Sequence, residues 1–599
     1  MTITQRVPRT INKIFFVVLF SGLFLFPSTA FPQANEISIW VAPCEQKIRP
    51  DDPVEKENLV WNESDKKISI AGAGNQHVAF QVVVTVPVPE DHNAKAAEGF
   101  FVKASDLKSD GGNIIPNGRV KLYLEQYILL YGKSSLVGAT GFWPDALAPL
   151  KVPFNMQALY RQPHYEIVRN KSIWIDVAIP AKTPAGNYKG IIDVTQNGRL
   201  LSQLKVELKV YDFSLPDKTH LITYMNISRG GLADFYHKPD SSREIDSLTQ
   251  IYYKFLYDHR MEPWFNDQLQ PKVIVHNEKV TVQFNDERYR YYMDSLRTNR
   301  VLLNSYPSEL KRQIMVKEFS PEFRKMVGSY LTQVASYFEK HGWKDKLVFN
   351  SPIDEPDSKE DFENTRLWAG LVHQAAPGIP FLATKTPVPP KEHPDWGTLQ
   401  GYVNDFSIHG NMLNDPKVKL AIRENEVKGG EMTWYISCDQ TYPQPNYFID
   451  APALDPVMIP WITARYHMDG ILYWALNYWT ETANPWLDAV TFHSGFLCSD
   501  GYVLNGEGSL LYPGDYTKEY TGQPNVNGPV SSIRLELLRE GMEDYEYLWM
   551  LKHLGDKEFA ASEVKDLVVS VRAFSRNLGE LYLDREAMAK RLEELTQKR

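Results

Sequence analysis

The apolar residues of this chain change their spacing near residue 216, and this change limits the possible folds more than any other feature of the sequence. Before it, apolar and polar residues alternate, as they do in strands with one buried face. After it, short apolar runs alternate with segments of helical period, a pattern typical of a parallel sheet covered by helices. We therefore expect a multidomain α and β protein in which a β domain precedes an α/β domain.

The alternating part predicts an N-terminal antiparallel β-sandwich over residues 35–213. The runs at 77–86 and 204–211 alternate almost without a break, and Asn197-Gly198 between two such runs is a type I′ hairpin signal. Residues 211–217 look like a linker to the next domain. No cluster of catalytic residue types is visible in the sandwich, so we expect it to pack against the second domain or to help hold a polymer.

The rest of the chain predicts a (β/α)8, TIM-like barrel over residues 218–552, followed by a C-terminal helical extension over 553–599. An inserted hairpin is expected at 272–284, and a long Gly-, Pro- and Asn-rich loop from about 480 to 529 is expected to build a pocket wall. Strands are expected near 220–225, 261–265, 301–304, 347–349, 380–383, 402–408, 432–437 and 470–474. Helices are expected near 244–257, 287–298, 321–341, 359–375, 416–423 and 455–467.

Two adjacent carboxylates, Asp354 and Glu355, follow the apolar run at 347–349 and precede Pro356. Proline cannot donate to a strand ladder, so the acids lie at the C-terminal end of the fourth predicted strand. In a barrel of this kind, that end of the sheet forms the catalytic face. Two carboxylates in one pocket disfavour each other's ionisation, so such a pair can keep one proton near neutrality and donate it.

The residues after this pair leave a second interpretation open. Asp357, Ser358 and Glu360 have the composition of a helix N-terminus, so the preceding acids could belong to an ordinary capped loop. Spacing alone does not separate a capping role from a catalytic role.

Composition excludes some classes of function. The net charge of -9, with no cluster of Lys and Arg, argues against a nucleic-acid partner. The 14 Trp and 32 Tyr suit either a large core or the apolar faces of sugars. Three cysteines without a CxxC pair form neither a disulfide framework nor a zinc motif. Asp500, Asn505 and Glu507 do not have EF-hand spacing, so we interpret them as turn residues and expect no metal and no cofactor.

The N-terminus has the pattern of a signal peptide over residues 1–30. Arg6, Arg9 and Lys13 precede an apolar run at 14–26, and small residues follow at 28–30. No later apolar stretch reaches the roughly 18 residues that suggest a transmembrane helix. We therefore expect a periplasmic or secreted protein with no integral membrane segment after signal removal.

Four segments carry a resemblance to a known family. They are the Asp354-Glu355-Pro356 strand end, the turn Pro-Ala-Gly-Asn-Tyr-Lys-Gly at 184–190, the loop Leu-Tyr-Pro-Gly at 511–514 and the helix Arg-Leu-Glu-Leu-Leu-Arg-Glu-Gly-Met-Glu-Asp-Tyr-Glu-Tyr at 534–547. Together they resemble glycoside hydrolase family 123, the β-N-acetylgalactosaminidases, and its uncharacterised relatives. The helix is the most specific segment. Its charged residues are expected to form ion pairs on the helix surface: Arg534, Glu536, Arg539, Glu543 and Asp544.

The resemblance implies substrate-assisted catalysis with retention of configuration. The 2-acetamido oxygen of the sugar would attack the anomeric carbon and form an oxazolinium ion. Glu355 would protonate the glycosidic oxygen and later deprotonate water, and Asp354 would orient the acetamide and stabilise its positive charge. The implied partner is a glycan that carries a terminal β-linked N-acetylhexosamine.

Two other functions remain open. A conventional retaining glycosidase would need a nucleophilic carboxylate about 5 to 5.5 Å from the acid. Asp439, near the end of the seventh predicted strand, is the candidate, because Glu431 lies at the opposite end of that strand. Alternatively, the chain could be a non-catalytic carbohydrate-binding protein, although the presence of both Asp354 and Glu355 argues against this.

Candidate substrate-binding residues lie near the ends of four predicted strands. Alternate residues of a strand face opposite ways, so about half of them are expected to pack in the core. Candidates for stacking on a sugar or binding its acetamide group are Trp434, Tyr435, Tyr473, Trp474, Asn477 and Trp479. Candidates for the hydroxyl groups of the sugar are Asn226, Arg229, Asn404 and His409, the last of which could equally be a structural histidine.

Overall fold

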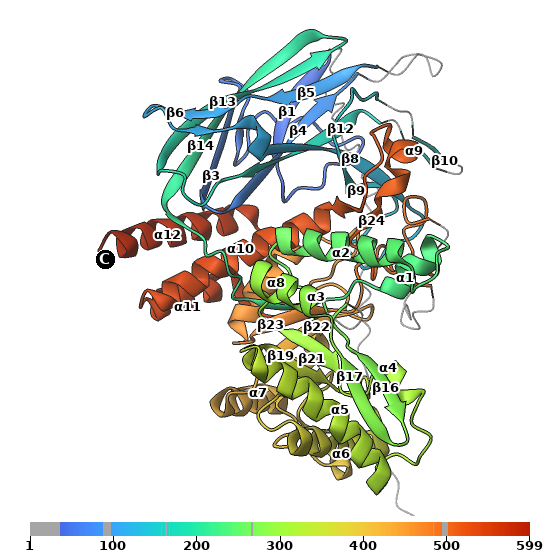
Figure 1. Cartoon of the computed structure of the whole chain (residues 1–599). Coiled ribbons are helices and arrows are strands. Elements are labelled where there is room, and N and C mark those ends of the chain that lie inside the picture. The colour runs from blue at the N-terminus through green and yellow to red at the C-terminus, as the bar shows by residue number, and fades with distance from the viewer. Residues whose placement is uncertain are drawn as a thin grey trace, which may run out of the picture.

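The computed structural model describes residues 36–87, 97–156, 159–161, 164–166, 168–264, 268–482, 484–493 and 501–598. The predicted signal peptide lies outside these residues. A β-rich N-terminal domain and a C-terminal α/β domain lie on opposite sides of helices α10 (Ile533–His553) and α12 (Leu578–Gln597) (Figure 1). The chain is therefore multidomain, as predicted.

The β domain consists of two sheets whose inner faces share one core, which includes Trp40, Phe80 and Leu208. In strand order, the first contains β1 (Ser38–Pro43), β4 (His77–Thr85), β12 (Asn170–Ala178), β8 (Val120–Leu130), β9 (Gly141–Pro149), β25 (Pro529–Ser532) and β24 (Tyr512–Pro513). The second contains β2 (Trp61–Asn62), β3 (Lys67–Gly74), β14 (Arg199–Ser214), β13 (Gly186–Gln196), β6 (Leu107–Ser109) and β7 (Ile114–Ile115), with β5 (Phe100–Ala104) also on β13.

Three details of this domain test the predictions. Asn197 (φ 49°) and Gly198 (φ 79°) form the predicted hairpin turn between β13 and β14. The prediction of a purely antiparallel sandwich is wrong, because β14 pairs with β3 in parallel. An alternating pattern shows which face of a strand is buried, but it does not show whether the neighbouring strand is parallel or antiparallel. The predicted linker is also shorter than expected, because β14 continues to Ser214.

Part of the first sheet comes from the far end of the sequence. Strands β24 and β25 lie in and beyond the loop predicted at 480–529, and β25 pairs with β9. The Tyr512 hydroxyl donates a hydrogen bond of 2.6 Å to Asp145 Oδ2 on β9. The β domain is thus completed by residues that follow the last strand of the α/β domain.

The α/β domain contains a curled parallel sheet of seven strands. Their order is β15 (Ile222–Met225), β23 (Gly470–Tyr473), β22 (Met432–Ile436), β21 (Asp405–His409), β20 (Phe381–Ala383), β19 (Leu347–Asn350) and β18 (Val301–Asn304). Each corresponds to a predicted strand. A complete eight-stranded barrel is not confirmed, because within the described residues the predicted strand at 261–265 contributes only one bridge, from Pro263 to Met225. Proline has no N–H to extend the ladder.

Helices cover this sheet at the predicted places. They are α2 (Arg243–Asp258), α5 (Pro321–Lys340), α6 (Lys359–Ala375), α7 (Pro416–Lys428) and α8 (Leu454–Arg465). The helix predicted at 287–298 is shorter, with α3 (Asp286–Arg290) followed by one π-helical turn. The predicted inserted hairpin is present as β16 (Lys272–His276) and β17 (Lys279–Gln283).

Short elements complete the fold. They are α1 (Arg229–Phe235), α4 (Ser308–Lys311), α9 (Thr517–Thr521), α11 (Lys557–Leu567) and the two-stranded pairs β10 (Leu159–Arg161) with β11 (His164–Glu166) and β26 (Val568–Ser570) with β27 (Ala573–Phe574). Within the described part of the chain, no helix combines the length and the apolar character that crossing a bilayer requires.

Helix α10 is the central element between the two domains, and its charged residues are not on a surface. Arg534, Glu536, Arg539, Glu543 and Asp544 are all buried, so their predicted position on the helix surface is wrong, although Glu536 and Arg539 do form an ion pair of 2.9 Å. The helix also approaches α8 closely at Gly541, where an added Cβ would lie 2.3 Å from the Val457 carbonyl oxygen. Because burying an unpaired charge is costly, the charged residues of this buried helix need partners, and neighbouring elements supply most of them.

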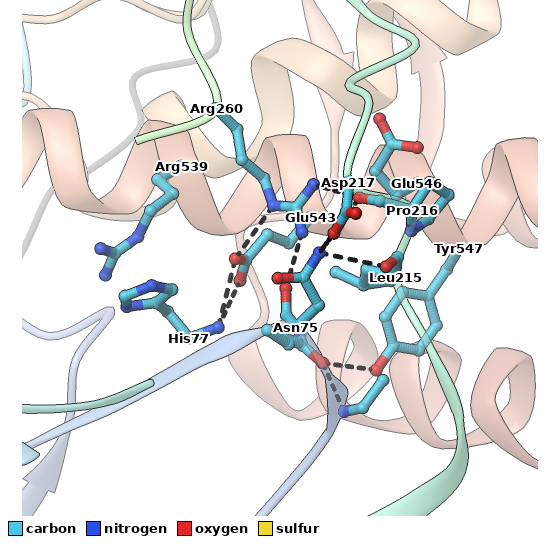
Figure 2. Close-up of polar contacts among 12 residues, drawn as sticks. Asn75, His77, Leu215, Pro216, Asp217, Arg260, Arg539, Glu543, Glu546 and Tyr547 are labelled. Carbon is cyan, nitrogen blue, oxygen red and sulfur yellow. Dashed lines mark hydrogen bonds and ion pairs between the residues drawn. The ribbon is translucent and has the colours of Figure 1, made fainter. Parts of the chain in front are cut away.

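Figure 2 shows how these partners join the two domains. Glu543 accepts hydrogen bonds of 3.2 and 3.3 Å from the backbone N–H of His77, and Arg260 Nε lies 3.5 Å from Glu543 Oε1. Asn75 Nδ2 donates to the carbonyl oxygens of Leu215 and Pro216 at 3.2 and 3.3 Å. Contacts from both domains therefore hold the connection between them in place.

Asp405, at the start of β21, allows a prediction about stability. Its carboxylate is buried and Oδ2 has no partner among the described residues, and burial raises the pKa of Asp405 to about 7. Because an unfolded chain ionises this acid near pH 4, the folded protein loses stability as the pH rises from about 4 through 7. We expect Asp405→Asn to gain stability relative to wild type between pH 5 and pH 8, by on the order of 2 kcal/mol, and to be the more stable protein at pH 8.

Urea unfolding at both pH values measures this difference. Asp65→Asn is the matched control, because Asp65 is exposed, and it should change stability equally at both pH values. A variant of Asp405 that is less stable than wild type at pH 8 would contradict the prediction.

Candidate active site

The C-terminal ends of the central parallel strands surround a cavity of about 890 Å³. This volume lies within the range of small-ligand pockets. Five of the residues predicted to bind or transform substrate line it: Asp354, Glu355, His409, Tyr435 and Trp474. Asp439, the candidate of the alternative mechanism, lines it as well. The structure therefore brings together residues from four different strand ends.

One hydroxyl group holds the side chain of Asp354 and the backbone of Glu355. Thr384 Oγ1, immediately after β20, donates a hydrogen bond of 2.6 Å to Asp354 Oδ1 and accepts one of 3.1 Å from the backbone N–H of Glu355. The two carboxyl side chains remain exposed toward the cavity. Thr384 thus orients Asp354 and the backbone of the neighbouring acid together.

The backbone of Glu355 is strained. Its φ of 43° lies in the left-handed region, which residues with a Cβ seldom adopt, and the following Pro356 further disfavours helical conformations at Glu355. Strain of this kind costs on the order of 1–3 kcal/mol and is concentrated at functional sites. Helix capping does not explain it, because Ser358 caps α6 by accepting from the Asp361 N–H. The pair is therefore not the cap of the next helix.

Tyr435, on β22, connects to the acid pair. Its hydroxyl group donates a hydrogen bond to Glu355 Oε1. Burial and the Glu355 carboxylate raise the pKa of Tyr435, so the phenol keeps its proton. Tyr435 is therefore a permanent donor that fixes one oxygen of Glu355 and leaves the other facing the cavity.

A second polar group lies beside Tyr435. Asp439 Oδ1 lies 2.8 Å from both His409 Nε2 and Ser437 Oγ, and Asn411 Nδ2 donates to Oδ2 at 2.8 Å. Burial opposes the ionisation of Asp439, but the contacts with His409 and Ser437 outweigh it and lower the pKa of Asp439. The His409 ring packs edge-on against Tyr435 at 4.9 Å between ring centroids. Asp439 is thus a charged carboxylate whose two oxygens both have partners.

Aromatic rings form one wall of the cavity. Trp474, just after β23, lies 5.2 Å from Phe492 and 5.0 Å from Tyr478 between ring centroids. Trp474 and Phe492 line the cavity, and so does Lys385. Aromatic faces of this kind pack against the apolar faces of sugar rings.

The sequence predictions missed three of these residues. Thr384 and Lys385 follow the fifth predicted strand, so the rule that located Asp354 at a strand end would also have found them. Phe492 carries no such signal, because it comes from the long loop after β23 and only the folded chain brings it to the cavity.

Four predicted binding residues pack away from the cavity instead. Trp434 and Tyr473 alternate with Tyr435 and Trp474 along their strands, and both are buried on the outer face of the sheet. Trp434 Nε1 donates to Thr463 on α8 at 2.8 Å. Two more residues also lie in buried hydrogen-bonded positions, namely Asn477, bonded to Ser228, and Trp479, bonded to Ser509.

The candidates for sugar hydroxyl groups are corrected in the same way, except for His409. Asn226 Nδ2 donates to the Trp474 carbonyl oxygen at 2.8 Å, so it supports the backbone behind the cavity. Arg229 forms ion pairs with two aspartates on and before α2. Asn404 precedes β21, at the opposite edge of the sheet, where its Oδ1 accepts from the Phe381 N–H at 3.1 Å. None of the three lines the cavity.

Among the described residues, one trio has the side-chain types and proximity of a metal site, and it does not line this cavity. It consists of Cys44, Glu45 and Glu540, whose ligand atoms lie within 4.8 Å of one another. Arg585 contacts Glu45 at 2.6 Å and Glu540 at 3.4 Å. A guanidinium group therefore already neutralises charge at the position that a cation would need.

Comparison with known proteins identifies the family of the chain. The sequence model described as "Glycoside hydrolase 123, catalytic domain" matches residues 293–551, and the "Glycoside hydrolase 123 N-terminal domain" matches residues 55–196. A search of curated proteins found no match. The matched catalytic segment contains Asp354, Glu355, Tyr435, Asp439 and Trp474.

One solved structure supports the fold. A family 123 glycoside hydrolase from Clostridium perfringens, studied for glycolipid glycan hydrolysis, superposes with a TM-score of 0.64 at 15% identity, covering 94% of this chain and 98% of that one. A family 39 glycoside hydrolase from Bacteroides cellulosilyticus is more distant, with a TM-score of 0.33 at 9% identity over 80% of this chain and 81% of that one. The catalytic and N-terminal matches together span most of the chain, which therefore belongs to glycoside hydrolase family 123 and is a glycoside hydrolase.

Proposed function

We propose that this protein is a retaining N-acetyl-β-galactosaminidase that uses the 2-acetamido group of its substrate as the nucleophile. The observation that carries this proposal is the arrangement of two adjacent acids in one cavity, each fixed by a different hydroxyl group. Thr384 fixes Asp354, and Tyr435 fixes Glu355. The choice of galactosamine over glucosamine rests on the family resemblance.

The first step breaks the glycosidic bond. The acetamide oxygen attacks the anomeric carbon, while Glu355 gives its proton to the departing glycosidic oxygen. Asp354 accepts the acetamide N–H and stabilises the positive charge that develops on the oxazolinium ring. Tyr435 donates to Oε1 of Glu355, so the second oxygen carries the proton and points toward the leaving group.

The second step opens the oxazolinium ring. Glu355, now a carboxylate, takes a proton from water, and the resulting hydroxide attacks the anomeric carbon. The acetamide group is regenerated, with its N–H again bonded to Asp354. Two successive inversions at the same carbon give net retention of configuration.

The contacts of Asp439 support this mechanism over a covalent enzyme nucleophile. Both carboxylate oxygens already have polar partners, because Oδ1 accepts from Ser437 and contacts His409, and Oδ2 accepts from Asn411. Hydrogen bonds to a carboxylate stabilise its charge and reduce its tendency to attack carbon. Asp439 is better suited to holding His409 beside Tyr435.

The site of action is part of the same proposal. The signal-like segment at 1–30 favours a periplasmic or secreted enzyme, and such an enzyme would meet glycans outside the cytoplasm. Expression of the full chain with fractionation of the cells tests this, since activity should appear in the periplasm or medium.

A panel of three chromogenic substrates tests the reaction. We expect turnover of the β-N-acetylgalactosaminide, weaker turnover of the β-N-acetylglucosaminide and no measurable turnover of the plain β-galactoside, because only the first two contain the internal nucleophile. Equal turnover of the plain galactoside would contradict substrate assistance and would make Asp439 the residue to change next. NMR of the first-formed product should show the β-anomer.

A further inference from the structure

We infer that Glu507 is a positioning residue that fixes the indole ring of Trp474 as the surface against which the sugar packs, and that Arg534 and Asp145 hold the loop of Glu507 in place. This inference rests on the proposed function only in taking the cavity as the sugar site. It extends the active site to three buried residues that do not line the cavity, one of them in the β domain.

The first contact is between the indole and the carboxylate. Trp474 Nε1 donates a hydrogen bond of 2.5 Å to Glu507 Oε1. Trp474 is partly exposed and lines the cavity, whereas Glu507 is completely buried behind it. A directional bond to the N–H edge of an indole sets the rotation of the ring as well as its position. Glu507 therefore determines which face of Trp474 points into the cavity.

The energetics indicate that this contact does more than satisfy the indole N–H. A partly exposed tryptophan can bond to water, so it does not need a buried partner. Burial raises the pKa of Glu507 to about 7, which means that the carboxylate is costly to keep at this position. Other buried acids of this chain have a raised pKa as well, and Glu507 differs from them in contacting a ring that lines the cavity.

Gly508 supplies the space for the ring. Its φ is 67°, and an added Cβ would lie 2.5 Å from Cζ2 and 2.8 Å from Cη2 of Trp474. The Gly508 N–H donates to the Tyr473 hydroxyl and its carbonyl oxygen accepts from the Tyr478 N–H, both at 2.9 Å. The loop and the segment that carries Trp474 are thus joined on both sides of the indole.

Arg534, on α10, holds both ends of this turn. Its Nη1 donates to the Gly506 carbonyl oxygen at 2.9 Å, and its Nη2 donates to the Ser509 carbonyl oxygen at 2.6 Å. Asp145 on β9 accepts two hydrogen bonds from the same guanidinium, at 2.8 and 2.7 Å. Because this bidentate pair is fully buried, it has one well-defined geometry. A carboxylate of the β domain therefore fixes the loop that orients the sugar surface.

The test is a double-mutant cycle between Glu507 and Trp474, measured as kcat/KM on the substrate that the wild-type enzyme turns over best. Glu507→Leu should lower kcat/KM by about 10- to 100-fold, the effect of misplacing a substrate-positioning group by about 1 Å. Glu507→Gln should recover most of that loss, because its amide oxygen still accepts the indole N–H. In the Trp474→Phe background, which has no N–H, Glu507→Leu should cost nothing further.

A control variant and a crystal structure accompany the double-mutant cycle. Glu125→Leu removes a different buried acid, in the β domain, and should leave kcat/KM unchanged. The crystal structure of Glu507→Leu should show the indole of Trp474 rotated or in several positions, and this readout requires no substrate. An unmoved indole, or a loss of kcat/KM that is the same with Phe at position 474, would overturn the inference. If the proposed function is wrong, the substrate panel shows it. The double-mutant cycle can still be measured on whichever substrate the enzyme prefers, so the two failures are distinguishable.

Discussion

Glu355→Gln is expected to lower kcat by about 10²- to 10⁴-fold, the range that general acid–base catalysis contributes. Gln has the same shape and still accepts the hydrogen bond from Tyr435, but it has no proton to donate and cannot deprotonate water. The variant should therefore bind substrate and remain folded. The loss of cleavage should be greater for a glycan leaving group than for a nitrophenyl leaving group, because nitrophenolate departs without a proton.

The measurements are kcat on both kinds of substrate and the thermal unfolding midpoint. Glu360→Gln is the matched control, since Glu360 is exposed in the first turn of α6 and should give wild-type kinetics. Wild-type turnover in Glu355→Gln would exclude this residue as the acid. An unfolded variant would indicate that Glu355 has a structural role at its strained position.

Asp354→Asn is expected to lower kcat by about 10²- to 10³-fold, as when one preorganised electrostatic partner of a transition state is removed. Asn keeps the shape of the side chain and still accepts the hydrogen bond from Thr384. It lacks the negative charge that stabilises the oxazolinium ion. The effect should therefore be on kcat for acetamido sugars, with little change in the thermal unfolding midpoint.

Asp439→Asn provides the comparison that separates the two mechanisms. Under substrate assistance it should cost less than Asp354→Asn, because the amide oxygen of Asn can still accept the hydrogen bond from Ser437. If Asp439→Asn instead abolished turnover, and added azide restored it with formation of an α-glycosyl azide, Asp439 would be a covalent nucleophile. That result would contradict the mechanism proposed for Asp354.

Local patterns were sufficient to predict the seven strands of the α/β domain and most of its helices. Each of the seven strands in its sheet is a short apolar run in a sequence that alternates with helical segments, and this rhythm is a property of neighbouring residues. The position of Asp354 and Glu355 at the cavity follows from the same rule, because the carboxyl ends of parallel strands meet at one edge of a sheet. These patterns fail at Pro263. The segment around it has the composition of a strand, but proline lacks the N–H that a strand ladder requires.

Local patterns did not predict the contacts between distant parts of the chain. The helix at 534–547 reads as a charged surface helix, because a charged side chain is normally solvated. In the fold it is buried between two domains, and Arg534 finds its partner Asp145 nearly four hundred residues earlier. Likewise, Tyr512–Pro513 looks like loop sequence and becomes a strand only because a free edge of the first sheet lies beside it.

The sequence by itself determined the order of the elements, the family and the position of the two acids, because all three depend on residues close together in the chain. Only the tertiary structure decided which member of each aromatic pair faces the cavity, how Thr384 and Tyr435 hold the acids, and why Glu507 is buried behind Trp474. The physical reason is that alternation defines two faces of a strand without saying which is inside. Partners for buried polar groups, in turn, come from whichever segments the packed core brings into reach.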